Sequence, residues 1–496
     1  MALFRAYSPT CLLANFACFE KMIFNSLTFL VFAAIFLPVY FSLRGRPRLL
    51  WSLTGSYIFY GWWDWRFLSL IFISTMVDFV LGQKIAQIEE PSKRKQLIWI
   101  SMVLNLGFLG FFKYFNFFTD SFVTLLQGFG LNPSVHTLNI ILPVGISFYT
   151  FQSMSYTIDI YRRQLEPEPD FFRFATFVAF WPQLVAGPIV RASDFLPQFR
   201  NDRSWDWDRF TSGMAQVLWG FFKKVAVADS LAPFVDQCWA EPMAFTSINL
   251  WIAVFFYSFQ IYCDFSGYSD IAIGSARILG FTFPENFRTP YFSQNFSEFW
   301  RRWHISLSSW LRDYLYIPLG GNRGSKFMMY RNNMLTMLLG GLWHGANWTF
   351  VFWGFLHGLY LVVQRLLGRP FGSLMQILRF PNWMKVGINI ALVYSFTNLA
   401  WIYFRSPNFG VATDVISNLV SFEGFNFVSV MNKFIVMKGL FLIALLLTVE
   451  ISDLKIQWSG VVMKSPAFRV ASFAVLLWLI AFFGTFGSNA FIYFQF

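Results

Sequence analysis

Two histidines lie where a neutral imidazole could perform acid–base chemistry. Residues 338–348 read LLGGLWHGANW, which places His344 in a strongly apolar run between glycines. Ionisable side chains inside a membrane segment are rare and costly, so each is a functional candidate. Desolvation keeps an imidazole neutral and therefore able to accept a proton. This context favours a general base at His344, and a packing histidine is the alternative.

The second histidine, His304, lies 40 residues upstream of His344. Residues 296–318 read FSEFWRRWHISLSSWLRDYLYIP, and their apolar positions recur at the spacing of one helical face. The pattern predicts one amphipathic helix in the membrane interface, on which spacing alone favours a structural role for His304. His357 follows His344 by 13 residues, about 220° around a continuous helix, so we interpret it as a packing residue. His136 lies in a polar loop and receives no role.

A basic loop at residues 318–326 reads PLGGNRGSK. A P-loop needs four residues between its glycines and a Ser or Thr after the lysine. Here three residues separate Gly320 from Gly324, and Phe327 follows the lysine, so that motif is absent. The loop could instead meet the phosphates of a cytosolic acyl-coenzyme A, or it could be an ordinary cytoplasmic basic loop. The cations concerned are Arg323, Lys326 and Arg331.

Other candidate groups are acids inside apolar runs. Asp264 and Asp270 lie in the segment CDFSGYSD, and Asp78 lies in an apolar stretch near the N-terminus. They could form a proton path, or they could be held by a cation or a helix end, which is the better-supported interpretation. The chain has no Gly-x-Ser-x-Gly elbow for a serine nucleophile. The four cysteines lack metal-type spacing and lie near none of the histidines, so no metal site is predicted.

The composition shows which kind of element must position these groups. Of the 496 residues, 56% are apolar, 21% are aromatic and 13% are charged, and the mean hydropathy is +0.49. This balance excludes a disordered chain, a secreted disulfide scaffold and an ordinary soluble enzyme, and it predicts a polytopic membrane protein. The net charge of +12 comes from basic residues between hydrophobic runs. That placement follows the positive-inside rule and does not indicate nucleic-acid binding.

Apolar runs long enough to cross a bilayer predict about eleven membrane spans, together with short re-entrant or interfacial helices. In the first part of the chain, basic loops fall on every second connection, which places 44–48 in the cytoplasm and the residues before Ile23 outside. The first five spans are Ile23–Leu43, Leu49–Trp63, Phe67–Gly82, Leu97–Phe118 and Asn139–Tyr161. Further apolar stretches lie at 171–190, 210–232, 246–263, 268–282, 333–364, 386–404, 433–449 and 466–487.

Several central stretches are interrupted by residues that break or charge a helix. Trp181-Pro182 and Gly187-Pro188 divide one stretch, and Lys223-Lys224 divides another. Broken helices at membrane depth are tolerated where they are buried or line a cavity. We therefore expect one membrane domain at 22–496, with a catalytic core at about 260–364. Residues 1–21 have no signal-peptide features. Because residues 22–26 resemble a natural start, we interpret 1–21 as an N-terminal extension or as the result of a start codon assigned too early.

Several motifs, in order along the chain, resemble the membrane-bound O-acyltransferase family, and more narrowly its bacterial polysaccharide branch. The resemblance runs from Met22 to the end of the chain. The motifs are PQLVAGPI at 182–189, CDFSGYSD at 263–270, EFWRRWH at 298–304, WLRDY at 310–314, LGGNR at 319–323, GGLWHGA at 340–346 and FIYFQF at 491–496.

The resemblance implies an all-α ring of tilted helices around a central tunnel, with a funnel from each side of the membrane. It places the family's near-invariant histidine at His344 and its second polar residue at His304. His344 would be the general base for transfer of an acetyl group from acetyl-CoA or another thioester to a hydroxyl. His304 would orient His344 or bind the developing oxyanion. Supporting or oxyanion roles fall to Asn347, Trp343 and Asp313, and no tightly bound cofactor is expected.

By the same resemblance, the chain lies in the bacterial inner membrane, in contact with lipid, and O-acetylates an exopolysaccharide, with alginate as the leading polymer. Periplasmic acetyltransferase-type proteins and a polysaccharide machinery would be its partners. Acylation of peptidoglycan, cellulose or teichoic acid is an alternative within the same chemistry. A polysaccharide transporter or flippase is an alternative from another class. It predicts a repeat with matched broken helices, and the sequence contains no such repeat.

Overall fold

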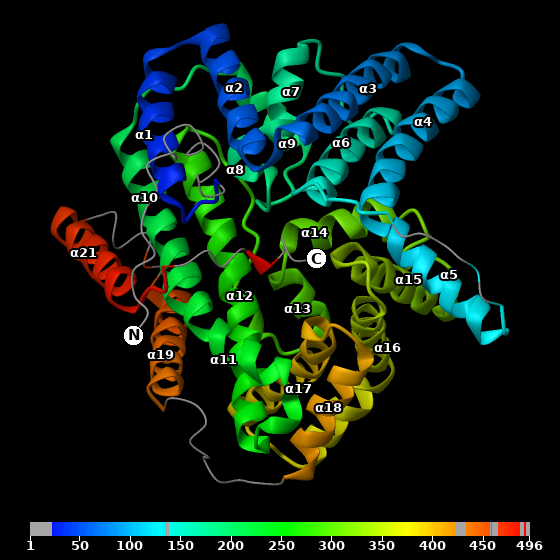
Figure 1. Cartoon of the computed structure of the whole chain (residues 1–496), viewed down its shortest axis with the longest axis vertical. Coiled ribbons are helices and arrows are strands. Elements are labelled where there is room, and N and C mark those ends of the chain that lie inside the picture. The colour runs from blue at the N-terminus through cyan, green and yellow to red at the C-terminus, as the bar shows by residue number, and fades with distance from the viewer. Residues whose placement is uncertain are drawn as a thin grey trace, which may run out of the picture.

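The structure, a computed structural model, describes residues 22–131, 133, 138–422, 433–456, 458, 465–486 and 491–492. The expected extension at 1–21 and His136 lie outside the described residues. Within the described ranges every regular element is a helix, which confirms the all-α prediction. Figure 1 shows α1–α4 (between Leu27 and Leu109) and α7 (Phe171–Ala179) at one end of the molecule. Helices α17 (Asn382–Arg405) and α18 (Phe409–Ser421) lie at the other end, and α12–α15 (between Ser247 and His344) lie between the two ends.

The N-terminal helices follow the predicted apolar runs. The fifth predicted span is shorter than expected, since residues 138–145 are not helical before α6 begins. A π-helical turn at Gly110–Tyr114 joins the fourth helix to the fifth, and it lies inside one predicted span. The helices are α1 (Leu27–Ser42), α2 (Gly45–Asp64), α3 (Leu68–Gln87), α4 (Pro91–Leu109), α5 (Phe115–Gly128) and α6 (Ile146–Tyr161).

Two basic connections in this half of the chain lie side by side. The Arg94 guanidinium donates a hydrogen bond to the Tyr161 carbonyl at 2.7 Å. Arg163 forms an ion pair of 2.6 Å with Glu89. The α3–α4 connection and the end of α6 therefore share one side of the helix layer, as the alternation of basic loops predicts.

The middle of the chain is broken at the proline pairs, as predicted, but not at the lysine pair, where the helix continues with a local change of hydrogen bonding. A π-helical turn, Phe222–Ala228, contains Lys223 and Lys224. One prediction here is wrong, because the stretches 246–263 and 268–282 form a single helix of 32 residues. The helices are α7 (Phe171–Ala179), α8 (Trp181–Leu184), α9 (Ala192–Phe195), α10 (Trp207–Phe221), α11 (Asp229–Ala240) and α12 (Ser247–Ile278).

The acids within α12 explain why this helix continues through a polar stretch. Lys224 contacts Asp264 at 2.6 Å and Asp229 at 2.7 Å, and Lys223 forms an ion pair with Asp270. Paired charges are tolerated inside a low-dielectric interior, where a single charge is not. Asp264 and Asp270 therefore hold α12 to the turn after α10, in line with the structural interpretation.

Close backbone contact between α10 and α12 makes these ion pairs reachable. A Cβ atom on Gly220 would lie 2.6 Å from the Gly267 carbonyl oxygen, and one on Gly213 would lie 2.7 Å from the Gly274 oxygen. Small residues allow helix backbones in membranes to approach this closely. The two glycine pairs are seven residues apart on both helices, so they face each other over two turns.

Asp78 has a structural role of the same kind in the N-terminal half. Its fully buried carboxylate accepts hydrogen bonds from Ser101 at 2.5 Å, from Asn105 at 2.8 Å and from Ser153. Donors from α4 and α6 thus meet on one side chain of α3. Buried polar groups persist when their hydrogen bonds are made, so this cluster fixes three helices together.

The C-terminal half carries the histidines and most of the aromatic core. Two short helices and a π-helical turn, Arg312–Tyr316, precede the two long helices that flank His344. The helices are α13 (Phe296–Arg302), α14 (Ile305–Leu311), α15 (Lys326–His344), α16 (Trp348–Ile377), α17 (Asn382–Arg405), α18 (Phe409–Ser421), α19 (Lys433–Ile456) and α21 (Pro466–Phe483).

Within the described ranges, seven helical segments are long and apolar enough to cross a membrane. This supports a multi-pass membrane protein. The segments are Gly45–Gln87, Pro91–Gly128, Ser247–Ile278, Trp348–Gly368, Asn382–Arg405, Lys433–Leu454 and Pro466–Phe483.

Helices α15 and α16 pack at backbone contact, and this packing gives a stability test. A Cβ atom on Gly354 would lie 2.2 Å from the Met337 carbonyl oxygen. Gly354→Ala is expected to lower the free energy of unfolding by about 1–3 kcal/mol, because the backbones must move apart. Gly368→Ala on the same helix, where nothing lies within 4 Å, is the matched control and should be neutral or stabilising by up to about 1 kcal/mol. Thermal unfolding of the detergent-purified variants measures both, and equal midpoints would contradict the close packing.

Candidate active site

The sequence predicts one continuous helix around His304, but the helix is interrupted at this histidine. His304 adopts a left-handed backbone with φ 42° and ψ 55° between α13 and α14. The non-helical segment Asn286–Arg288 stabilises the chain at this break through two backbone hydrogen bonds. Ile305 N–H donates to the Asn286 carbonyl and Arg288 N–H donates to the Arg302 carbonyl, both at 2.9 Å. His304 is fully buried. The expectation of one interfacial helix is therefore wrong, because these backbone bonds replace the helical ones.

Asn286 fixes the tautomer of His304. Its Oδ1 accepts hydrogen bonds from the Ser306 backbone N–H at 3.2 Å and the Ser306 hydroxyl at 2.9 Å, while its Nδ2 donates to Ser269 at 3.0 Å. The 3.2 Å contact between this oxygen and His304 Nδ1 requires the imidazole to donate. Nε2 of His304 then carries the lone pair and has no hydrogen-bond partner among the described residues.

His344 is the last residue of α15, and its ring is held by aromatic contacts. It is buried, and ring centroids of Trp343 and Trp353 lie 5.0 Å away, with Phe404 at 5.3 Å. Gly345 leaves the helix in an extended conformation, and a Cβ atom there would lie 2.2 Å from the Phe350 ring. The glycine after His344 thus allows α16 to close against the end of α15.

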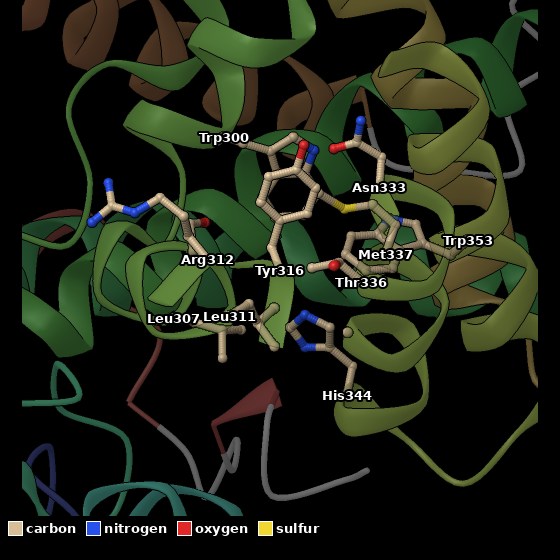
Figure 2. Close-up of a pocket in the computed structure, with 12 residues that line it drawn as sticks. Trp300, Leu307, Leu311, Arg312, Tyr316, Asn333, Thr336, Met337, His344 and Trp353 are labelled. Atoms are coloured by element: carbon tan, nitrogen blue, oxygen red, sulfur yellow. The ribbon is translucent and has the colours of Figure 1, made fainter. Parts of the chain in front are cut away.

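His344 lines two cavities. The larger cavity has a volume of about 160 Å³ and follows one face of α15 through Asn333, Thr336, Met337 and Gly340 to His344. Eleven residues of helix separate its ends, a length of about 16 Å at 1.5 Å per residue. Figure 2 shows the His344 ring at one end of this cavity and Asn333 at the other. The remaining lining residues are Trp300, Leu307, Ser308, Leu311, Arg312, Tyr316 and Trp353.

The smaller cavity, of about 40 Å³, touches His344 from another group of elements. Lys113 lies in its wall, and its Nζ donates to the carbonyl oxygens of Trp343 at 2.8 Å and His344 at 3.1 Å. Sequence reasoning did not select this residue, although a lysine inside the apolar run 97–118 is the signal that could have found it. The other lining residues are 142–148, Val185 and Trp343.

Trp343 connects the two histidines that the sequence selects. Its ring centroid lies 5.0 Å from that of His344 and 6.1 Å from that of His304. Of the described residues that line the two cavities, none is His304. His304 therefore reaches His344 through the Trp343 ring that lies between them. The supporting role that the resemblance implies for Trp343 stays a prediction.

Asp313 does not line the larger cavity but follows Arg312, which does, and it forms ion pairs. It contacts Arg312 at 2.6 Å and also pairs with Arg191, while Arg162 donates to its backbone carbonyl at 3.2 Å. Burial would raise the pKa of Asp313, but the hydrogen bonds from Arg312 and Arg191 outweigh it and hold that pKa below its ordinary value. An ionised acid paired in this way accepts hydrogen bonds and does not supply an oxyanion donor.

The three cations selected for donor binding do not line the larger cavity. Arg323 and Lys326 are exposed, and Arg331 is exposed with its guanidinium on Asn332 Oδ1 at 2.8 Å. The cation that the structure places in the described wall is Arg312. The donor-binding role of the three loop cations stays a prediction, and Arg312, on the π-helical turn that precedes the loop, is the cation that lines this cavity.

The interpretation of His357 as pointing away from His344 is wrong in its geometry. Residues 345–347 interrupt the helix, so the angle for a continuous helix does not apply. The Trp353 ring contacts both imidazoles, with centroids 5.0 Å from His344 and 4.8 Å from His357. His357 is buried among aromatic rings, and neither of its ring nitrogens has a hydrogen-bond partner among the described residues. These contacts agree with a packing residue.

Asn347 caps α16, and this provides a test against the oxyanion role. Its Oδ1 accepts from Thr349 N–H at 3.0 Å, and its Nδ2 donates to the Pro407 carbonyl at 2.7 Å. Asn347→Ala is expected to cost about 1 kcal/mol of stability, as for other lost N-caps, and to change the transfer rate less than tenfold. Loss of an oxyanion donor would instead slow the reaction by about 10²- to 10³-fold. Initial rates and thermal midpoints of Asn347→Ala and Asn347→Ser separate the two roles, because serine retains the cap.

Comparison of the amino-acid sequence with known proteins points to one family. Residues 161–406 match the sequence profile of the membrane-bound O-acyltransferase family. The chain is 45% identical over 406 residues to the probable alginate O-acetylase AlgI of Azotobacter vinelandii, covering 81% of this chain and 78% of that protein. It is 45% identical over 404 residues to the protein of the same name in Pseudomonas aeruginosa, covering 81% and 75%.

A third relative carries a different acceptor in its name. The peptidoglycan O-acetyltransferase of Helicobacter pylori is 36% identical over 438 residues, covering 81% of this chain and 80% of that protein. The profile match at 161–406 includes both histidines and every residue that lines the larger cavity. The chain therefore belongs to the membrane-bound O-acyltransferase family.

Proposed function

We propose that the chain transfers an acetyl group from a cytoplasmic thioester, acetyl-CoA being the first candidate, to an acceptor hydroxyl on the other side of the membrane. The observation that carries this proposal is the position of His344, which lines two cavities formed by different elements. One cavity can receive the donor and the other the acceptor, so both substrates meet at one imidazole.

Positive charge beside the larger cavity supports the donor's side. Arg312 lines this cavity, and Arg191 and Arg162 both contact the neighbouring Asp313. Since basic residues are retained on the cytoplasmic side, we infer that the cavity opens beside Arg312 to the cytoplasm. We infer that the two cavities are the halves of one tunnel. Two of the seven segments each contain two helices, α2 with α3 and α4 with α5, so counting these separately and adding the shorter apolar helices α1 and α18 gives about eleven spans.

In the proposed reaction His344 acts as the general base. Its unprotonated ring nitrogen removes the proton of the acceptor hydroxyl while the oxygen attacks the thioester carbonyl carbon. The tetrahedral intermediate then collapses, the carbon–sulfur bond breaks, and the imidazolium returns the proton to the leaving thiolate. The products are the acetyl ester and the free thiol. General base catalysis of this kind contributes about 10²- to 10⁴-fold to the rate.

His304 is proposed as a positioning residue. Asn286 holds its ring and its ring faces Trp343, which in turn contacts His344. In this arrangement His304 helps to hold the Trp343 ring against His344 without itself contacting the substrate. Trp343 forms part of that wall, and the resemblance to the family remains the ground for giving His304 a role in the reaction.

The acceptor proposed first is an exopolysaccharide, and alginate is its leading candidate. The relatives named for alginate O-acetylation share 45% identity with the chain, against 36% for the relative named for peptidoglycan. The chain would lie in the bacterial inner membrane and deliver acetyl groups to periplasmic acetyltransferase-type proteins of a polysaccharide machinery. Peptidoglycan is the second candidate acceptor, because that relative spans the same share of the chain.

Sealed membrane vesicles of opposite orientation test the sidedness of the reaction. Acetyl-CoA labelled in the acetyl group should acetylate an enclosed acceptor in inside-out vesicles, whose cytoplasmic face is exposed, and not in sealed right-side-out vesicles. The acceptor is a short oligomer of the polysaccharide loaded together with the periplasmic fraction. Equal labelling in both orientations, with no leakage of an enclosed dye, would contradict the assignment of the larger cavity to the donor.

A further inference from the structure

Lys113 is a buried lysine inside a membrane-spanning segment, Pro91–Gly128. It lies on the π-helical turn Gly110–Tyr114, and such turns are frequent at functional sites. A lysine at this depth is costly and persists when it has partners. Its partners are at the end of the helix that carries the proposed base.

The hydrogen bonds of this turn end on the last carbonyls of α15. Lys113 Nζ donates to the oxygens of Trp343 at 2.8 Å and His344 at 3.1 Å, and the Tyr114 hydroxyl donates to the Leu342 oxygen at 2.9 Å. The last carbonyls of a helix have no partner within the helix. Two adjacent side chains of one π-helical turn thus satisfy three consecutive carbonyls at the end of α15.

Charge and aromatic contacts reinforce this arrangement. A helix C-terminus carries a partial negative charge, which a cation stabilises. The Lys113 ammonium also lies 5.9 Å from the Trp343 ring centroid. Its third contact, with the Ser147 hydroxyl at 3.4 Å, leads to the start of α6. Lys113 therefore joins α15 and α6 at the wall of the smaller cavity, beside His344.

We propose that Lys113, together with Tyr114, positions His344 for catalysis by fixing the peptide units that end α15. This inference rests on the proposed function of His344. The two donors hold residues 342–344 in place, so the imidazole stays at the junction of the two cavities. A displacement of about 1 Å of a reacting group can cost about 10²-fold in rate. Lys113 is a positioning residue in this account, because its donors are used on backbone oxygens.

Three variants test this role in inside-out vesicles with varied acetyl-CoA. Lys113→Met removes the ammonium and should lower kcat by about 10²-fold while the KM for acetyl-CoA changes less than about twofold, because the donor cavity has other walls. Lys113→Arg keeps a cation and should recover part of that kcat. Tyr114→Phe removes one hydroxyl and should lower kcat by about three- to tenfold. Lys95→Met, an exposed lysine on α4, is the matched control and should behave as wild type.

The outcomes decide the proposal in each case. A fall in kcat at constant KM, with a thermal midpoint like that of wild type, supports positioning. An unchanged kcat, or a raised KM at unchanged kcat, overturns it. If Lys113→Met does not accumulate in the membrane, the conservative Tyr114→Phe decides by the same two criteria. His344→Ala is measured alongside: if that variant keeps the wild-type rate, the proposed function fails, whereas loss of activity in His344→Ala with normal Lys113→Met removes the positioning role alone.

Discussion

Replacing His344 by alanine is expected to slow acetyl transfer by about 10²- to 10⁴-fold, the usual contribution of a general base. The imidazole lines both cavities, so its removal leaves the acceptor hydroxyl without a proton acceptor at the point where the substrates meet. Initial rates with labelled acetyl-CoA in inside-out vesicles measure the effect. His344→Gln tests the chemistry further, since glutamine retains a polar side chain but is not a base.

The matched control for this expectation is His357, a buried histidine that contacts the same Trp353 ring as His344. His357 packs against Phe299 and Trp300, with ring centroids at 5.9 Å and 5.0 Å, and lines neither described cavity. His357→Phe conserves the aromatic packing and should keep the rate within about tenfold of wild type, since repacking a volume-conserving site is tolerated. A larger loss of rate in His357→Phe than in His344→Ala would show that His344 is not the base.

The second large effect is expected from filling the larger cavity. Thr336 is buried on the α15 face that leads from Asn333 to His344. Thr336→Trp adds an indole to a space of about 160 Å³. The indole would block the donor's thioester group from reaching the imidazole. Acetyl transfer should fall by at least about 10²-fold, because the thioester carbon no longer reaches the base.

The neighbouring residue supplies the control for the cavity. Leu335, on the same helix, is 37% exposed and does not line the cavity. Leu335→Trp introduces the same bulk without entering the cavity and should leave the rate near that of wild type. Thermal midpoints of both variants exclude general unfolding as the cause. Transfer at the wild-type rate by a folded Thr336→Trp protein would show that the donor uses another path.

Much of the helical layout follows from the sequence, because long apolar runs and prolines act locally. The break at Trp181-Pro182 lies where the sequence predicts it, whereas the predicted interruption at Lys223-Lys224 is only a π-helical turn within a continuous helical stretch. The merger of two predicted spans into α12 could not be foreseen, since it depends on the pairing of Asp264 with Lys224 across two helices. Such ion pairs arise from tertiary contact and leave no periodic signal.

The candidate site was predicted in part. His344, His304 and Trp343 lie together as the motifs indicate. The break at His304 was not predicted, because the hydrogen bonds that stabilise it come from Asn286 and Arg288, outside the amphipathic pattern. Lys113 lies 231 residues from His344 in the chain, so only the fold shows that the two meet.

The measurement that tests the central claim most directly is ester-linked acetate on the secreted polymer from cells carrying wild-type protein or His344→Ala. Polymer mass and the membrane level of the protein are recorded on the same samples. The account predicts that acetate is lost while polymer and protein persist. Acetate at the wild-type level would contradict the assignment of His344 as the base, and loss of the polymer itself would favour an export function instead.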